Sequence, residues 1–140
     1  MSSSPLLPNF LGGQWHTGSG AGTPLMDPVL GTELARVSSN GLDLAEGFRF
    51  AREQGGQALR AMSYGERAGL LAAIVKVLQA HRDAYYEIAT ANSGTTAKDS
   101  AVDIDGGIFT LGYYAKQGES LGSALALLDG ERIRMCKDPV

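Results

Sequence analysis

The spacing of apolar residues changes once along the chain, near Asn40. Before that point, short apolar segments alternate with glycine-rich or Asp-Pro punctuation, a pattern typical of short strands joined by turns. The segments span residues 9–15, 23–27 and 33–37. We therefore expect a β-meander or hairpin over about residues 9–37.

After Asn40 the apolar period becomes helical. A first helix is expected over residues 42–54, where apolar side chains recur every third or fourth position. Asn40 is the expected N-cap, because its side chain can accept a hydrogen bond from a free backbone amide of the first turn. The Gly55-Gly56 pair is expected to end this helix.

A second helix is predicted to open on "SYGE", where Ser63 and Glu66 have the spacing of a capping box. A third helix, over about residues 82–92, is expected to stop at Gly94, since glycine readily takes the left-handed conformation at a helix end. The second helix is expected to present one face made of Arg67, Leu70, Leu71, Ile74, Val75 and Leu78.

The fourth predicted helix begins at a second capping box, Thr96 with Asp99, and runs to about residue 117. Helical spacing divides its apolar side chains into two stripes, so we expect contact on two sides. One stripe is Ile104, Ile108, Leu111 and Ala115, and the other is Val102, Gly106, Phe109 and Tyr113.

Gly106 and Gly107 are unexpected inside a helix, because each costs roughly 1 kcal/mol relative to alanine. Two explanations remain open for Gly106: another backbone packs closely there, or a ligand passes. Asp103 and Asp105 do not form a carboxylate pair for acid–base chemistry, because residues two apart on a helix point about 200° away from each other.

Charge and composition exclude several classes of partner. The net charge is −3, and the 12 basic residues are scattered rather than clustered, so we expect no nucleic-acid partner. No apolar run is long enough to cross a membrane, and with a single cysteine we expect a cytoplasmic protein. The "GSGAG" segment (18–22) is interpreted as a hairpin turn and not as a phosphate loop, because no Lys-Ser/Thr follows it.

Several long motifs resemble the N-terminal region of the aldehyde dehydrogenase superfamily. They are "ALRAMSYGERAGLLAAIVKVLQAHRDAYYEIATANSGTT", "AVDIDGGIFTLGYYAK" and the preceding "GGQWHTGSGAGTPLMDPVLGTELARV". The resemblance covers essentially the whole chain. It implies an α/β fold in which residues 1–140 form the N-terminal part of the NAD(P)-binding domain. The expected parts are strands over about 9–37, a four-helix layer over about 42–117, and the start of an oligomerisation strand at about 132–140.

Within the superfamily, "VDIDGGI", "LRAMSYGERA" and "SSNGLDLA" are most similar to enzymes that oxidise CoA-bound semialdehydes in aerobic aromatic breakdown. The resemblance implies NADP (or NAD) as cofactor of the full-length enzyme, a CoA-linked aldehyde substrate and a homodimer. It also implies that Val102 and Gly106 line the substrate channel to the catalytic cysteine. With the resemblance, substrate passage and close backbone packing explain Gly106 equally well.

The residues that the family uses for bond making all lie downstream of this region: the cysteine, the glutamate and the asparagine. We therefore expect no catalytic and no cofactor-binding residue here, and no bound cofactor in this piece alone. The surroundings of Cys136 do not match the family's nucleophile. At Asn92 many relatives carry an acidic residue that helps to hold a monovalent cation, and so no metal is expected.

His16 and His81 are interpreted as surface residues, because neither has a metal-ligand partner at a useful spacing. The chain resembles a truncated enzyme, so the remainder of the dehydrogenase chain is its first expected partner. The alternative is a stand-alone interaction module derived from the same fold, which would bind a partner or self-associate through apolar helix faces.

Overall fold

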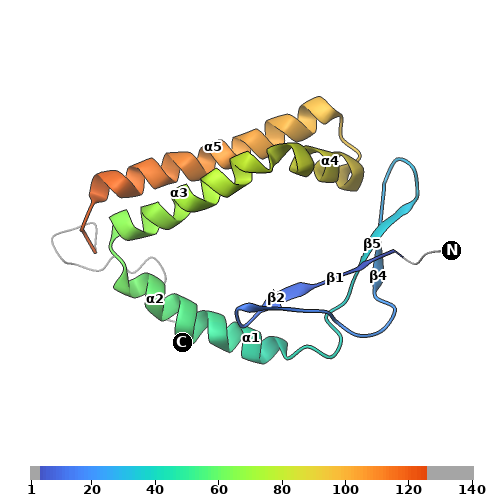
Figure 1. The fold of residues 1–140 in the computed structure, drawn as a ribbon, viewed down its shortest axis with the longest axis horizontal. Helices are drawn as coiled ribbons and strands as arrows, with labels where there is room; N and C mark the ends of the chain where they lie inside the picture. Colours follow the sequence, from blue (N-terminus) through green and yellow to red (C-terminus); the bar gives the residue numbers. More distant parts are fainter. Residues whose placement is uncertain (1–3, 126–140) are drawn as a thin grey trace, which may run out of the picture. The chain divides into compact units, whose positions relative to one another are not determined.

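The computed structural model describes residues 4–125, which divide into two compact units (Figure 1). Within the described part, unit 1 contains residues up to 57 together with 81–107, and unit 2 contains 58–80 together with 108–125. The division passes through α5 (Ala97–Leu121) directly after its glycine pair. The predicted strand at 132–140 and Cys136 lie outside the described residues.

Five short strands in unit 1 form two separate sheets. One sheet has the order β1 (Leu6–Leu7), β5 (Glu33–Val37), β4 (Thr23–Met26), and the other pairs β2 (Asn9–Leu11) with β3 (Gln14–His16). The β1–β5 pair is parallel, and the other two pairs are antiparallel. Among the described residues the strands therefore form more than the single meander expected from the sequence.

The glycine-rich segment 18–22 is not a hairpin turn, contrary to the sequence prediction. It connects β3 to β4, which belong to different sheets. The segment is held by the chain that follows β5, since the Ser19 amide donates to the Asn40 carbonyl at 2.8 Å and the Ser38 hydroxyl donates to the Ser19 carbonyl at 2.7 Å. A Cβ at Gly18 would lie 2.2 Å from the Ser38 carbonyl oxygen, so glycine is required there.

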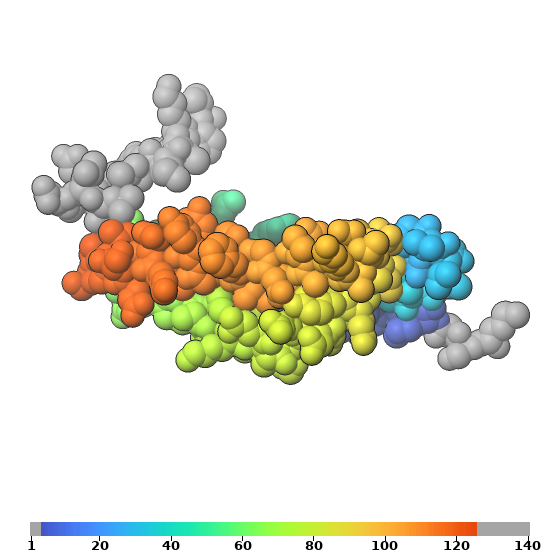
Figure 2. Space-filling view, turned by 90° about the horizontal axis from the view of Figure 1, so that it is seen from above, coloured from blue at the N-terminus to red at the C-terminus, as the bar shows by residue number. Residues whose placement is uncertain are grey.

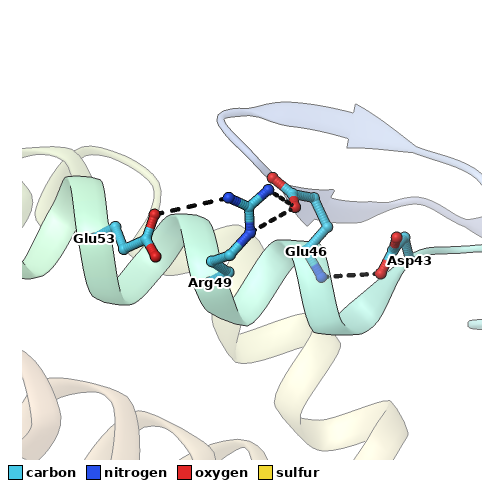
Figure 3. A network of polar contacts seen from close by, with 4 residues as sticks. All are labelled: Asp43, Glu46, Arg49 and Glu53. Carbon is cyan, nitrogen blue, oxygen red and sulfur yellow. Dashed lines mark hydrogen bonds and ion pairs between the residues drawn. The ribbon is translucent and has the colours of Figure 1, made fainter.

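The first helix begins later than predicted, and its cap is Asp43 instead of Asn40. Helix α1 spans Leu44–Phe50, and the Asp43 carboxylate accepts a hydrogen bond from the Glu46 amide at 2.9 Å. Figure 3 shows this cap, and it also shows Arg49 between the carboxylates of Glu46 and Glu53. Asp43 caps because it lies directly before the first helical residue, where its side chain reaches the free amides.

The Gly55-Gly56 pair does not end the helix, which is a second correction. The chain continues from α1 through a π-helical turn, η1 (Ala51–Gly55), into α2 (Gly56–Ala61). Glycine ends a helix when it takes a left-handed conformation, but Gly56 has φ −63° and ψ −39°, which are right-handed helical values.

Helix α3 (Tyr64–Ala80) opens on the predicted capping box, which is confirmed. The Glu66 carboxylate accepts from the Ser63 amide at 2.7 Å, and the Glu66 amide donates to the Ser63 hydroxyl oxygen at 3.3 Å. The two backbone amides between Ser63 and Glu66 also have acceptors. Tyr64 donates to the Ala124 carbonyl, and Gly65 donates to the Gly122 carbonyl. All the early amides of α3 therefore have acceptors.

Unit 2 packs α3 against residues 108–121 of α5, and Figure 2 shows these two segments lying side by side. Ala68, Ile108 and Ala115 are the buried apolar residues of the described chain. The predicted face of α3 is correct only in part: Leu71, Val75 and Leu78 are half-buried, whereas Leu70 and Ile74 are exposed. The buried line is centred on Ala68, because small side chains let the helices approach closely.

The mixed α/β class expected from the sequence is confirmed by these elements. Within residues 4–125, no helix combines the length and the apolar character that crossing a bilayer requires.

Candidate functional site

The candidate site lies on α5, and the connection from α4 (Arg82–Ser93) determines where that helix starts. Gly94 ends α4 in a left-handed conformation, with φ 67°, and its amide donates to the Thr90 carbonyl. The left-handed end at Gly94 was predicted from the sequence. The second capping box is also confirmed, since the Asp99 amide donates to the Thr96 hydroxyl oxygen at 3.2 Å and the Thr96 hydroxyl donates to the Asp99 carboxylate at 2.7 Å.

A buried hydroxyl cluster anchors the first turn of α5. Ser100 is only 1% exposed, and its hydroxyl oxygen lies 2.8 Å from that of Thr90 and 2.7 Å from that of Thr95. Burying a polar group without a partner is costly, and these two contacts satisfy the Ser100 hydroxyl. The cluster therefore joins α4, the turn and α5.

A second polar contact joins the same two helices one turn further from the connection. The Tyr86 hydroxyl donates to the Asp105 carboxylate at 2.6 Å. This hydrogen bond is the main cause that raises the pKa of Tyr86 above its ordinary value, with desolvation as the next cause. The direction follows from the bond, because a carboxylate acceptor favours the protonated form of the phenol.

The two residues that the resemblance assigns to a substrate channel lie on an open face of α5. Val102 is 65% exposed, and a Cβ built at Gly106, one helical turn later, would meet no atom within 4 Å. Close packing against residues 4–125 therefore does not explain Gly106. A side chain at Gly107 would also meet no atom within 4 Å.

The same helical stripe continues in unit 2 with Phe109, which is 74% exposed, and Tyr113, which is 51% exposed. The opposite stripe, with Ile108 and Ala115, is the buried one. Of the two stripes of α5 that were expected to make contacts, only the one with Ile108 and Ala115 is buried within the described chain. The open stripe is apolar apart from the Tyr113 hydroxyl and carries no charged side chain, so its chemistry suits contact with an apolar or neutral ligand.

The described residues show no cluster of three or more histidine, cysteine, aspartate or glutamate side chains that could hold a metal ion. His81 lies at the N-cap of α4, and His16 lies at the end of β3. Both are exposed, as is Asn92 in the last turn of α4.

Two of the hollows in the described chain lie beside α4 or α5, each within a single unit. In unit 1, a hollow of about 720 Å³ lies between the β4–β5 loop, with Val29 and Leu30, and the end of α4, with Tyr86 and Thr90. In unit 2, a groove of about 380 Å³ lies between α3 and α5 and is lined mostly by small residues. Neither lining includes a cysteine or a histidine.

Sequence reasoning missed the Tyr86–Asp105 contact and the Ser100 cluster. Both join residues on different helices, and no local motif identifies such pairs. Once the α4–α5 hairpin is assumed, however, Thr90 and Tyr86 fall opposite Ser100 and Asp105 as the chain doubles back.

Comparison with known proteins agrees with the resemblance. A model of the aldehyde dehydrogenase family matches residues 15–140. The chain is 48% identical over 134 residues to the 3,4-dehydroadipyl-CoA semialdehyde dehydrogenase of Aromatoleum evansii, an alignment that covers 96% of this chain and 26% of the relative. The chain thus spans about a quarter of the length of that relative.

Proposed function

The chain belongs to the aldehyde dehydrogenase family, and from that membership we propose that it forms the N-terminal part of an NAD(P)-dependent dehydrogenase for a CoA-thioester semialdehyde. The support is the 48% identity to a relative whose name specifies such a substrate. An NADP preference, a homodimer, a cytoplasmic location and a role in aerobic aromatic degradation belong to the same proposal, and the resemblance of the "VDIDGGI" segment supports them.

In this proposal the bond-making groups lie on polypeptide outside these 140 residues. The resemblance implies covalent catalysis by a cysteine outside this chain, and a bound nicotinamide would supply the hydride acceptor for that reaction. This proposal is supported by the glycine-rich segment 18–22, which leads into β4 and not into the helix N-terminus that a dinucleotide-binding glycine motif precedes. We therefore propose that this piece is inactive alone.

The contribution of this chain is one wall of the substrate passage, made by Val102 and Gly106. One observation carries this assignment: Val102 is exposed, and a side chain at Gly106 would point into open space beside it. A long thioester substrate needs a wide passage, and glycine at this position supplies width at the cost of helix stability.

The test is Gly106→Met in the full-length enzyme. We expect the KM for a CoA-semialdehyde to rise about tenfold or more, with little change for acetaldehyde, because a pocket discriminates by roughly this factor for one or two methylene groups. The matched control is Gly107→Met, which makes the same helix-propensity change about 100° around the axis. Equal effects on both substrates, or equal effects of both variants, would contradict the passage assignment.

A second candidate function is a stand-alone interaction module without enzymatic activity. Its support is the number of large apolar side chains that are exposed on helices, among them Phe48 and Ile88. The reading frame that follows the Val140 codon separates the two candidates. A continuation that encodes "Asn-Phe-Pro" and a later cysteine supports the dehydrogenase, and a stop codon without a frameshift remnant supports the module.

A further inference from the structure

The turn of α5 that contains Gly106 has little intrinsic rigidity. Two consecutive glycines cost roughly 2 kcal/mol of helix propensity together, because glycine loses the most backbone entropy on folding. A side chain at either position would meet no atom within 4 Å, so side-chain packing at these positions does not support the turn within the described chain. A passage wall built on such a turn needs support from its neighbours.

The Tyr86–Asp105 hydrogen bond is placed to give that support. Asp105 directly precedes Gly106, and its carboxylate accepts the Tyr86 hydroxyl at 2.6 Å. The distance is typical of a short, charge-assisted hydrogen bond. The Ser100 cluster anchors α5 five residues earlier, so the Tyr86 contact is the next polar anchor towards the glycine pair.

We propose that Tyr86 is a positioning residue for the substrate passage: through Asp105 it holds the α5 backbone at Gly106 against α4 and so keeps the passage wall in place. This inference rests on the proposed function. Tyr86 itself need not touch the substrate, because it acts through Asp105, which lies about 100° around the helix axis from Gly106. The expected signature is a change in substrate discrimination and in local rigidity, with the chemical step unchanged.

The first experiment measures kinetics of the full-length enzyme with a CoA-semialdehyde and with acetaldehyde. Tyr86→Phe keeps the ring and removes the donor, and we expect the KM for the CoA-semialdehyde to rise about threefold, with kcat and the acetaldehyde KM unchanged. Asp105→Ala should act in the same way. Asp105→Asn should raise the KM less than Asp105→Ala does, because its amide oxygen still accepts the hydrogen bond but without the negative charge.

Tyr85→Phe is the matched control, since Tyr85 lies on the same helix, and no hydrogen bond of its hydroxyl is seen within residues 4–125. We expect it to leave both KM values unchanged. In the double variant Tyr86→Phe/Asp105→Ala, the KM should be no higher than in either single variant, because both substitutions remove one contact. A full sum of the two effects would overturn the proposal.

The second experiment separates this inference from the proposed function. Amide hydrogen exchange in the peptide covering residues 100–110 of the full-length protein should be faster in Tyr86→Phe than in Tyr85→Phe. Unchanged exchange overturns the proposal, as does faster exchange with an unchanged KM ratio. If the wild-type enzyme does not oxidise a CoA-semialdehyde, the proposed function fails, whereas the exchange result still decides whether Tyr86 supports this turn.

Discussion

Glycines at two places on the long helix α5 have opposite surroundings. At Gly106 and Gly107 an added side chain would meet no atom within 4 Å. At Gly118, only three turns later, an added Cβ would lie 3.0 Å from the Cβ of Ala68 and 3.3 Å from the Tyr64 carbonyl oxygen. The residue type and the secondary structure are the same, yet one position is open and the other is a close contact between helices.

The difference shows that a glycine inside a helix has no single meaning. In unit 2 the absent side chains let α3 and α5 approach, and Gly65 contributes from the other helix, with its Cβ position 3.0 Å from the Gly122 carbonyl oxygen. In unit 1 the absent side chain leaves space beside Val102. Packing within residues 4–125 accounts for the close contact at Gly118 but not for Gly106 and Gly107, and for Gly106 we propose substrate passage.

The largest expected effect comes from filling the close contact. Gly118→Leu should lower the free energy of unfolding by about 2 kcal/mol, because overpacking forces the helices apart. Gly112→Leu on the same helix is the matched control, since its Cβ position meets no atom within 4 Å. The control should be neutral or stabilising by about 0.5 kcal/mol. Urea midpoints of the full-length protein measure both, and equal midpoints would remove the distinction between the two groups.

Gly94 adds a third case to the comparison of glycines, because it has both a left-handed backbone conformation and a close contact. Its φ is 67°, and a Cβ would lie 2.9 Å from Cγ of Pro28. Gly94→Ala should lower the free energy of unfolding by about 1–2 kcal/mol, through the left-handed conformation and the clash together. Gly31→Ala isolates the conformational cost, since Gly31 has φ 66° and no atom within 4 Å of its Cβ position. If Gly94→Ala does not lower the thermal unfolding midpoint more than Gly31→Ala does, the close contact with Pro28 has no energetic effect.

The smallest expected effect is pH-dependent and tests the capped end of α3, next to Gly65. The Ser63 backbone amide, followed by the Ser63 hydroxyl, lowers the pKa of Glu66 below 4.5. A carboxylate with a lowered folded pKa stabilises the protein above its unfolded pKa, and this contribution is lost as the pH falls through the folded value. Wild type should therefore lose slightly more stability than Glu66→Gln when the pH falls below about 4.5. If the free energy of unfolding falls equally with pH in the two proteins across that range, the Glu66 cap does not contribute to stability.

Local signals in the sequence predicted local structure well. The capping boxes at Ser63 and Thr96 and the left-handed Gly94 were correct, because each depends on residues within one helical turn. The cap of α1 was wrong, because Asn40 and Asp43 are both suitable residue types and only the helix start decides between them. The prediction that Gly55-Gly56 ends the first helix was wrong, because glycine permits a helical conformation as easily as a left-handed one.

Contacts between distant residues were harder to predict. The parallel pairing of β1 with β5 joins residues thirty positions apart, and nothing in either strand specifies its partner. For the candidate site, helical periodicity placed Val102 and Gly106 on one face, and the family resemblance suggested what that face does. Periodicity could not show that this face is open and the Ile108 face buried, because both stripes are apolar.

The start of α3 has one further consequence. Its first two amides donate to carbonyls of Gly122 and Ala124, residues that follow the end of α5. Fraying at either helix terminus therefore removes hydrogen-bond partners from the other, which makes the two ends open together and not independently. A protease that cleaves between residues 122 and 124 should loosen the beginning of a helix nearly sixty residues earlier in the chain.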